Sequence, residues 1–180
     1  KFYETAADIG YFEATKPANA NDMPGGVTDR YYNRTNGVTY PFGYGLSYTT
    51  FKQTIKSSSA EGDNITLKVR VTNTGNYAGK EVVQVYFNPP YTDGGIEKAT
   101  ANLVAFEKTK TLAPGQSQTL TLTFAKRDMA SYDYNDANKN DHKGYELETG
   151  DYEISINSDS HNVIDKITYT HGATTYFDTD

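Results

Sequence analysis

The 180-residue sequence contains no cysteine and no tryptophan. Without cysteine the chain forms no disulfide and offers no thiolate metal ligand or cysteine nucleophile, and its compartment stays open between cytoplasmic and secreted. No apolar run is longer than a few residues, so no segment is long enough to span a bilayer as a helix. The first residues lack the charged and apolar stretches of a secretory signal, so any such signal is expected to have been removed or to lie elsewhere.

The sequence has fewer basic than acidic residues, with 17 Lys and Arg against 23 Asp and Glu, and its net charge is −6. Nucleic acids and anionic membrane surfaces are bound through Lys and Arg, so we expect neither as a partner. What the sequence does contain is 16 tyrosines, eight phenylalanines and abundant threonine, residue types that favour β-strands. The length corresponds to about one domain of ~100–200 residues.

From Tyr48 onward, short segments of alternating polarity are separated by turn residues. The clearest is 64–73, where the apolar side chains occur at every second position, as on a half-buried strand. Strands are expected over 49–57, 64–73, 80–88, 103–112, 118–125, 151–157 and 163–170. Their inward residues are expected to include Phe51, Ile55, Ile65, Leu67, Val69, Val71, Val83, Val85 and Phe87. About seven short strands with frequent turns predict an all-β protein, an immunoglobulin-like or fibronectin III-like antiparallel β-sandwich, with one helical turn over 126–133.

The sequence shows no catalytic constellation. Two carboxylates across a cleft would suit a glycosidase, but no acid is marked by its context as buried beside another. Ser47 lacks the second glycine and the following helix of a nucleophile elbow. His142, His161 and His171 fall in polar loops or terminal strands, where exposed side chains are expected. We therefore predict no catalytic residue and no cofactor.

One segment, 133–146, is dense in oxygen ligands. Aligned as a calcium loop from Asp136, it has Asp141 where the sharp turn needs glycine, and Leu147 where a bidentate glutamate belongs. An ordinary Asn/Asp hairpin turn explains the composition better, and no metal site is expected.

Residues 1–39 do not resemble a compact domain, because Pro, Gly, Asn and Asp gather between 13 and 37. So long an irregular segment is either a disordered tail or an ordered strap that covers another structure. Aromatic residues favour the strap, among them Tyr31 and Tyr32.

The segment that follows, YPFGYGLSYTTF (40–51), concentrates aromatic rings between glycines. Pro41 stiffens the entry, whereas Gly43 and Gly45 are expected to allow unusual backbone angles or the close approach of another segment.

Five motifs occur in order: YPFGYGLSYTTF, VTNTGNYAGKEVVQVY, LVAFEKTKTLAPGQSQTLTLTF, DMASYD and YELETGDYEISI. Together they resemble the fibronectin type III-like domain of family 3 glycoside hydrolases, the β-glucosidases and their relatives, from about Tyr40 to about Asn157. The resemblance implies three parts. Residues 1–39 would be a strap that begins with the last strand of an α/β sandwich domain, 40–170 the β-sandwich, and 171–180 an extension or linker.

In that family a (β/α)8 barrel carries the nucleophilic aspartate, usually in a Ser-Asp-Trp context, and an α/β sandwich domain supplies the acid/base. The fibronectin III-like domain packs beside both and is not catalytic. The absence of tryptophan excludes that nucleophile motif from this chain. The resemblance thus implies an accessory domain whose partners are the barrel and α/β sandwich domains, in the same or another polypeptide. A β-linked oligosaccharide or glucoside would be the substrate of the whole enzyme.

Interdomain contacts are then expected from Tyr40, Phe42, Tyr44 and Tyr48, whose rings combine large contact area with polar tips. The alternatives for these rings are that they cap the sandwich's own core or stack on sugars.

Two other functions stay open for the chain as a whole: a free-standing carbohydrate-binding module and an adhesin-like spacer. Cleft-rim or sugar contacts are expected from Tyr31, Tyr32 and Tyr91.

Overall fold

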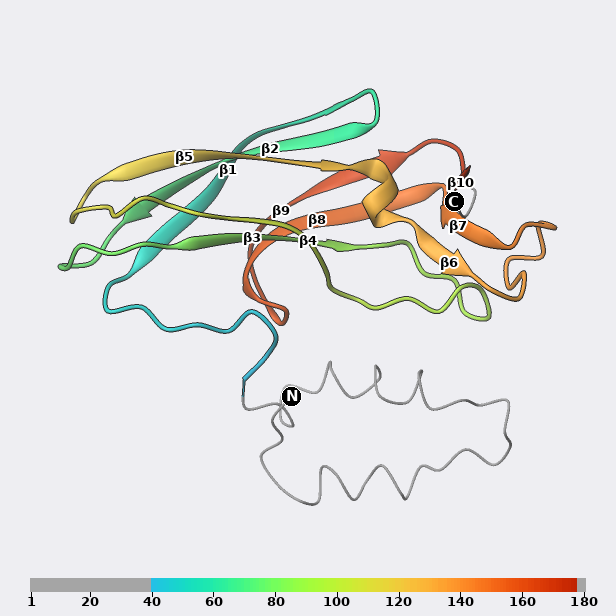
Figure 1. Ribbon diagram of the computed structural model, residues 1–180, viewed down its shortest axis with the longest axis horizontal. Coiled ribbons are helices and arrows are strands. Elements are labelled where there is room, and N and C mark those ends of the chain that lie inside the picture. Colours follow the sequence, from blue (N-terminus) through green and yellow to red (C-terminus); the bar gives the residue numbers. More distant parts are fainter. Residues whose placement is uncertain (1–39, 178–180) are drawn as a thin grey trace, which may run out of the picture.

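The computed structural model describes residues 40–177, which form a β-sandwich (Figure 1). The first sheet has the order β1-β2-β5 and the second the order β4-β3-β8-β9, with all neighbours antiparallel. These strands are β1 (Phe51–Glu61), β2 (Asn64–Asn73), β3 (Val82–Asn88), β4 (Asn102–Lys108), β5 (Ser117–Ala125), β8 (Gly150–Asp159) and β9 (Asn162–His171). The all-β sandwich predicted from the alternating segments is confirmed.

The core lies between the two sheets and consists of the side chains that the alternation assigned to it. Strand β2 has the burial pattern of a strand with one face inward, and its outward Lys68 and Arg70 are exposed. The fully buried core residues include Leu67, Val69, Val71, Val83, Val85, Ile154 and Ile156. Burying an aliphatic side chain of this size is worth about 1.5–3 kcal/mol, so these residues supply much of the stability. Phe51 and Ile55 pack against this core from β1, also as predicted.

Ten strands are present in the described part of the chain, three more than the alternation predicted. The additional strands are β6 (Ser131–Asp133), β7 (Gly144–Leu147) and β10 (Thr175–Phe177), which pair in the order β10-β7-β6. They form a small sheet at one end of the sandwich (Figure 1). Strands of three or four residues are too short to show a period of two, so the sequence pattern missed them.

The predicted helical turn is a 3-10 helix, η1 (Lys126–Met129), between β5 and β6. Its buried Met129 joins the core, as does Leu147 of β7. Strand β10 lies within the residues expected to form an extension, and it pairs with β7. Within 40–177, η1 is much shorter than a helix that crosses a membrane.

Strand β1 is an edge strand, and its pairing with β2 shifts register between Ile55 and Ser57. At this irregularity the backbone N–H of Ile55 donates to a carboxylate oxygen of Asp165 on β9 (2.9 Å). The two sheets are thereby linked at one side of the sandwich through a side chain rather than through a strand ladder.

Candidate interdomain surface

Strand β3 is buried on both faces, whereas β2 is buried on one. Its inward Val83 and Val85 belong to the core, but the outward Gln84 and Tyr86 are also buried, with exposed fractions of 9% and 1%. Polar groups on the outer face of a sandwich are ordinarily in water, so something covers them here. Part of the cover is the segment that precedes β1.

Residues 42 and 43 lie directly over the outer face of β3. Gln84 donates from Nε2 to the carbonyl oxygens of Gly43 (3.0 Å) and Ser158 (3.1 Å). Its Oε1 accepts from the Tyr86 hydroxyl (2.9 Å). Burial, with Asp159 nearby, raises the pKa of Tyr86 to about 12, so this hydroxyl remains a donor at neutral pH.

Glycine is required at position 43 for two reasons. Its φ is +84°, in the left-handed region, and a Cβ there would lie 2.2 Å from Gln84 Oε1 and 2.7 Å from Tyr86 Oη. The prediction of an unusual backbone is therefore confirmed at Gly43 and wrong at Gly45. Gly45 does not have a positive φ, and an added Cβ would meet nothing within 4 Å.

A second anchor holds the segment where it enters β1. The fully buried Asn73 accepts from the Thr49 hydroxyl (2.9 Å) and the Gly75 N–H (3.0 Å). Its amide donates to the carbonyl oxygens of Tyr77 (2.7 Å) and Leu112 (2.8 Å). This one side chain ties together the end of β2, the following turn, the chain before β5 and the start of β1.

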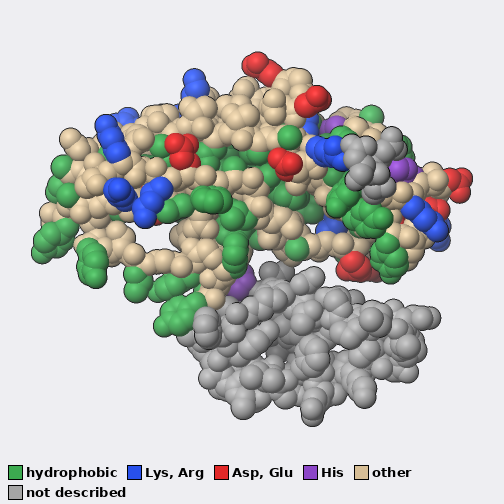
Figure 2. All heavy atoms as spheres, in the orientation of Figure 1, with side chains coloured by type: hydrophobic (Ala, Val, Ile, Leu, Met, Phe, Trp, Pro, Cys, Tyr) green, Lys and Arg blue, Asp and Glu red, His purple; other side chains and the backbone are tan. Residues whose placement is uncertain are grey.

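Between the two anchors the side chains point into solvent. We call residues 40–48 the aromatic segment. The exposed fractions are 54% for Tyr40, 67% for Phe42, 44% for Tyr44, 88% for Leu46 and 99% for Tyr48. The Tyr40 and Tyr44 rings contact each other, with centroids 5.2 Å apart. Figure 2 shows hydrophobic side chains projecting along this segment, which is blue in Figure 1. Such exposure argues against rings that cap the sandwich's own core.

The other ring predicted at a cleft rim, Tyr91, is 53% exposed and donates to a Glu97 carboxylate oxygen (3.2 Å). It lies in the β3–β4 connection, which Lys98 holds in place by donating to the Pro90 carbonyl oxygen (2.6 Å) and pairing with Glu148. The Lys98 side chain is only 4% exposed, so this ion pair is largely shielded from water. The remaining two, Tyr31 and Tyr32, lie outside the described residues.

The segment considered for calcium is the hairpin connection from β6 to β7. Asn138 and Asn140 donate their side-chain amides to the buried Glu146. Asp133 accepts backbone N–H groups of the same connection, Ala137 among them (3.0 Å). Burial raises the pKa of Asp133, but these N–H donors outweigh it and lower the pKa overall. Among residues 40–177 no group of three or more His, Asp and Glu is placed to hold a metal ion.

The three histidines, expected to be exposed, are all half-buried. His142 stacks on Tyr176, with ring centroids 4.5 Å apart. His171 contacts the Tyr169 hydroxyl (3.1 Å), and burial, together with Lys126, lowers its pKa. For His142 and His171, ring contacts that polar loop sequences do not reveal account for the difference.

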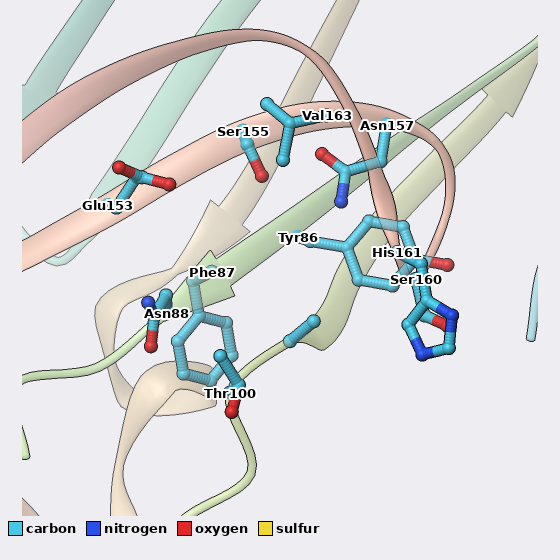
Figure 3. A pocket seen from close by; sticks show the side chains of 11 residues that line it. Tyr86, Phe87, Asn88, Thr100, Glu153, Ser155, Asn157, Ser160, His161 and Val163 are labelled. Atoms are coloured by element: carbon cyan, nitrogen blue, oxygen red, sulfur yellow. The ribbon is translucent and has the colours of Figure 1, made fainter. Parts of the chain in front are cut away.

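A cavity of about 280 Å³ opens on the outer face of the second sheet, beside the anchored segment (Figure 3). It is lined by Tyr86, Phe87, Asn88, Thr100, Ala101, Glu153, Ser155, Asn157, Ser160, His161 and Val163. The backbone N–H of Ser160 donates to the Phe42 carbonyl oxygen (2.8 Å), so cavity and aromatic segment share a wall. The sequence analysis did not predict that Gln84, Tyr86 and Asn157 are buried on the outer face of the second sheet. The sequence feature that could have indicated it is a polar side chain within an otherwise apolar strand.

Residues 81–160 match the sequence model of the fibronectin type III-like domain family. The chain carries a fibronectin type III-like domain. The match extends from just before β3 to just after β8, so it contains Gln84 and Tyr86, which lie under the aromatic segment, but not the second anchor, Asn73. The resemblance stated from the five motifs is confirmed.

This fibronectin type III-like domain is of the kind found in family 3 β-glucosidases. A β-glucosidase of Ruminococcus albus is 44% identical over 122 residues, which are 68% of this chain and 12% of that protein. β-Glucosidase A of Butyrivibrio fibrisolvens is 39% identical over 146 residues, covering 71% and 17%. The structure of β-glucosidase 3B from Thermotoga neapolitana in complex with glucose superposes with a TM-score of 0.72 at 36% identity, covering 84% of this chain and 20% of that one. The chain thus spans less than a fifth of the two relatives' length.

Proposed function

We propose that the chain is a non-catalytic accessory domain of a family 3 β-glucosidase, which packs through its aromatic segment against the domains that carry out hydrolysis. Those partners are a (β/α)8 barrel and an α/β sandwich domain, and the whole enzyme hydrolyses β-linked glucosides. Residues 1–39 belong to the strap and to the end of the α/β sandwich domain, 40–170 to the β-sandwich, and 171–180 to an extension.

The proposal rests on one observation: the backbone of the aromatic segment is held in place by hydrogen bonds, whereas its aromatic side chains are exposed to solvent. Hydrogen bonds hold the aromatic segment to β3 and to Asn73, yet Phe42, Leu46 and Tyr48 are 67%, 88% and 99% exposed. A loop that only connects two elements through solvent would require neither these buried hydrogen bonds nor several exposed aromatic side chains. Aromatic residues on a preorganised backbone are typical of the centre of a protein interface, because little conformational entropy is lost on binding.

The free-standing sugar-binding module has less support. The Tyr40 and Tyr44 rings, which contact each other, lie with 46° between their planes and so do not form one flat stacking surface. The relatives, moreover, are multidomain enzymes of which this region is a minor part.

The test separates catalysis from assembly. The purified chain is assayed with an aryl β-glucoside, alone and together with a polypeptide that carries the barrel and α/β sandwich domains of the same enzyme. We expect background hydrolysis from the chain alone, and a stable complex with raised activity or thermal stability when both are present. Hydrolysis by the chain alone, or the absence of a complex, contradicts the proposal.

Two variants locate the contact. Tyr48→Ser removes the most exposed ring of the aromatic segment, and Tyr134→Ser removes a 75% exposed ring beside β6. Complex formation is expected to weaken by about tenfold or more with Tyr48→Ser, as for a ring at an interface, and to change little with Tyr134→Ser. An equal effect of the two variants would refute the placement of the interface on the aromatic segment.

A further inference from the structure

The outer face of the first sheet carries basic side chains and hydroxyl groups. Successive rows of cross-strand neighbours on β1, β2 and β5 consist only of Ser, Thr, Lys and Arg. The first of these rows is Lys52, Thr72 and Ser117, and the last is Ser59, Thr66 and Thr123. The first acid along this face is Glu61, one row further on at the end of β1. Although the chain has a net charge of −6, this face is locally positive.

The three cations of this face, Lys52, Lys68 and Arg70, are exposed, and none forms an ion pair with a carboxylate of residues 40–177. On the outer face of the second sheet, by contrast, Lys166 pairs with Glu153. Lys68 and Arg70 are successive outward residues of β2, about 7 Å apart. Lys52 is the diagonal neighbour of Arg70, at about 7–8 Å. Like charges at this spacing repel one another, so an anion bound between them is favoured.

Hydroxyl groups surround the cations and define how a ligand could be held. Arg70 donates from Nη2 to the Ser117 hydroxyl (3.3 Å), which directs its guanidinium across β5. The other N–H groups of a guanidinium can bind a carboxylate in parallel pairs. Thr119 and Thr121 of β5 are exposed beside it, in the rows of Arg70 and Lys68. A hydroxyl both donates and accepts, so these side chains can exchange hydrogen bonds with the hydroxyl groups of a ligand.

These rows favour one kind of polyanion. An anionic membrane is bound with apolar side chains that enter the interface, and single-stranded nucleic acid with aromatic rings that stack on bases, and these rows contain neither. A nucleic-acid duplex has one charge per about 1.7 Å, so it repels an acidic chain strongly. A polysaccharide with one carboxylate per sugar or fewer has a lower charge density, and its hydroxyl groups match the Ser and Thr side chains.

We propose that the outer face of the first sheet binds a carboxylated polysaccharide, with Lys68 and Arg70 pairing with its carboxylates and the β5 threonines bonding to its hydroxyl groups. Binding is by charge and hydrogen bonds rather than by stacking on rings. The aromatic segment lies on the outer face of the second sheet, at the opposite side of the sandwich (Figure 1). A polysaccharide on the first sheet leaves it accessible, so this inference does not depend on the proposed function.

The test uses the full 180-residue chain, with polygalacturonate as the probe. Affinity electrophoresis measures binding, and NMR locates it through the backbone amides of β2 and β5. Methyl-esterified polygalacturonate keeps the sugar hydroxyls but removes the charge. Lys68→Gln/Arg70→Gln removes two cations from the face, and Lys139→Gln/Lys166→Gln makes the same change in net charge at exposed positions elsewhere.

We expect polygalacturonate to retard the chain and to shift the amides of 66–72 and 117–123. Lys68→Gln/Arg70→Gln should weaken binding about tenfold or more, because charge-assisted hydrogen bonds are lost. Lys139→Gln/Lys166→Gln should change it by less than about threefold. Raising NaCl from about 0.02 M to about 0.2 M should also weaken binding, because exposed charge pairs are screened.

Three results overturn the proposal. The first is absent binding, or equal binding by the two double variants. The second is equally tight binding of the methyl ester or of a DNA duplex, since carboxylates on a sugar chain would then not be what the face recognises. The third is self-association of the chain that Lys68→Gln/Arg70→Gln abolishes, because an acidic surface of a second copy would then be the occupant.

Discussion

The anchor at Gly43 makes a quantitative prediction that its neighbour Gly45 controls. In Gly43→Ala the new Cβ would occupy the position 2.2 Å from Gln84 Oε1, so the glutamine amide must move away. The hydrogen bonds from Gln84 to the Gly43 carbonyl oxygen and from Tyr86 to Gln84 are then lost or strained. The left-handed φ of +84° adds a backbone penalty for alanine.

The magnitude follows from these terms. An L-residue in the left-handed region costs about 1–2 kcal/mol, and each lost hydrogen bond costs about 0.5–1.5 kcal/mol. Together they predict a loss of about 2–5 kcal/mol from the free energy that holds the aromatic segment on β3. Because the segment can detach while the sandwich stays folded, the loss of global stability is at most this large.

Hydrogen exchange measures the detachment directly, because the Ser160 N–H is bonded to the Phe42 carbonyl oxygen. A loss of about 2–5 kcal/mol corresponds to exchange at Ser160 that is roughly 30- to 5000-fold faster. In Gly45→Ala, where the added methyl meets open space, exchange and stability to urea should stay within about 0.5 kcal/mol of the unaltered chain. If Ser160 exchanges equally fast in both variants, the anchoring role of Gly43 is refuted.

Three further variants test other parts of the domain by urea unfolding. Asn73→Ala should lower the unfolding free energy by about 2–4 kcal/mol, because buried backbone groups lose their partners, while the exposed Asn76→Ala should change it by less than about 0.5 kcal/mol; equal losses would contradict this. Lys98→Met should cost about 3–5 kcal/mol by leaving a shielded carboxylate unpaired, and Lys166→Met, in an exposed pair, less than about 1 kcal/mol; the reverse order would be decisive against it. A carboxyl whose folded pKa is lowered adds stability above its unfolded pKa and loses it as the pH falls through the folded value. Asp133→Asn should therefore flatten the decline in stability below about pH 4, and an unchanged pH profile would show that the loop N–H groups do not hold the carboxylate.

The sandwich was predictable because its signal is local. Ile65, Leu67, Val69 and Val71 alternate with polar residues, and a strand with one buried face has no other way to arrange them. Proline and glycine clusters marked most of the turns. All seven expected strands are present, and the single helical turn lies where it was predicted.

The cover over the second sheet was not predictable, because it depends on contacts between residues far apart in the sequence. Gln84 and Ser158 are 74 positions apart, and Gln84 and Gly43 are 41. A glutamine within an apolar strand is compatible with an exposed outer face, so its burial is known only once the segment that lies on it is placed. Gly43 and Gly45 both lie next to Tyr44, and their unequal roles arise from the same long-range contact.

The hydrogen bond between the Ile55 N–H and Asp165 protects the edge strand β1 against pairing with another chain. A free strand edge invites another chain to add to the sheet and so begins aggregation. On β1 the register shift interrupts the regular ladder, and the Ile55 N–H that an incoming strand would need is already bonded to a carboxylate. The negative charge at this position also repels the edge of an identical molecule. The β1 edge is therefore a poorer template than a regular strand edge for pairing with a second copy of the chain.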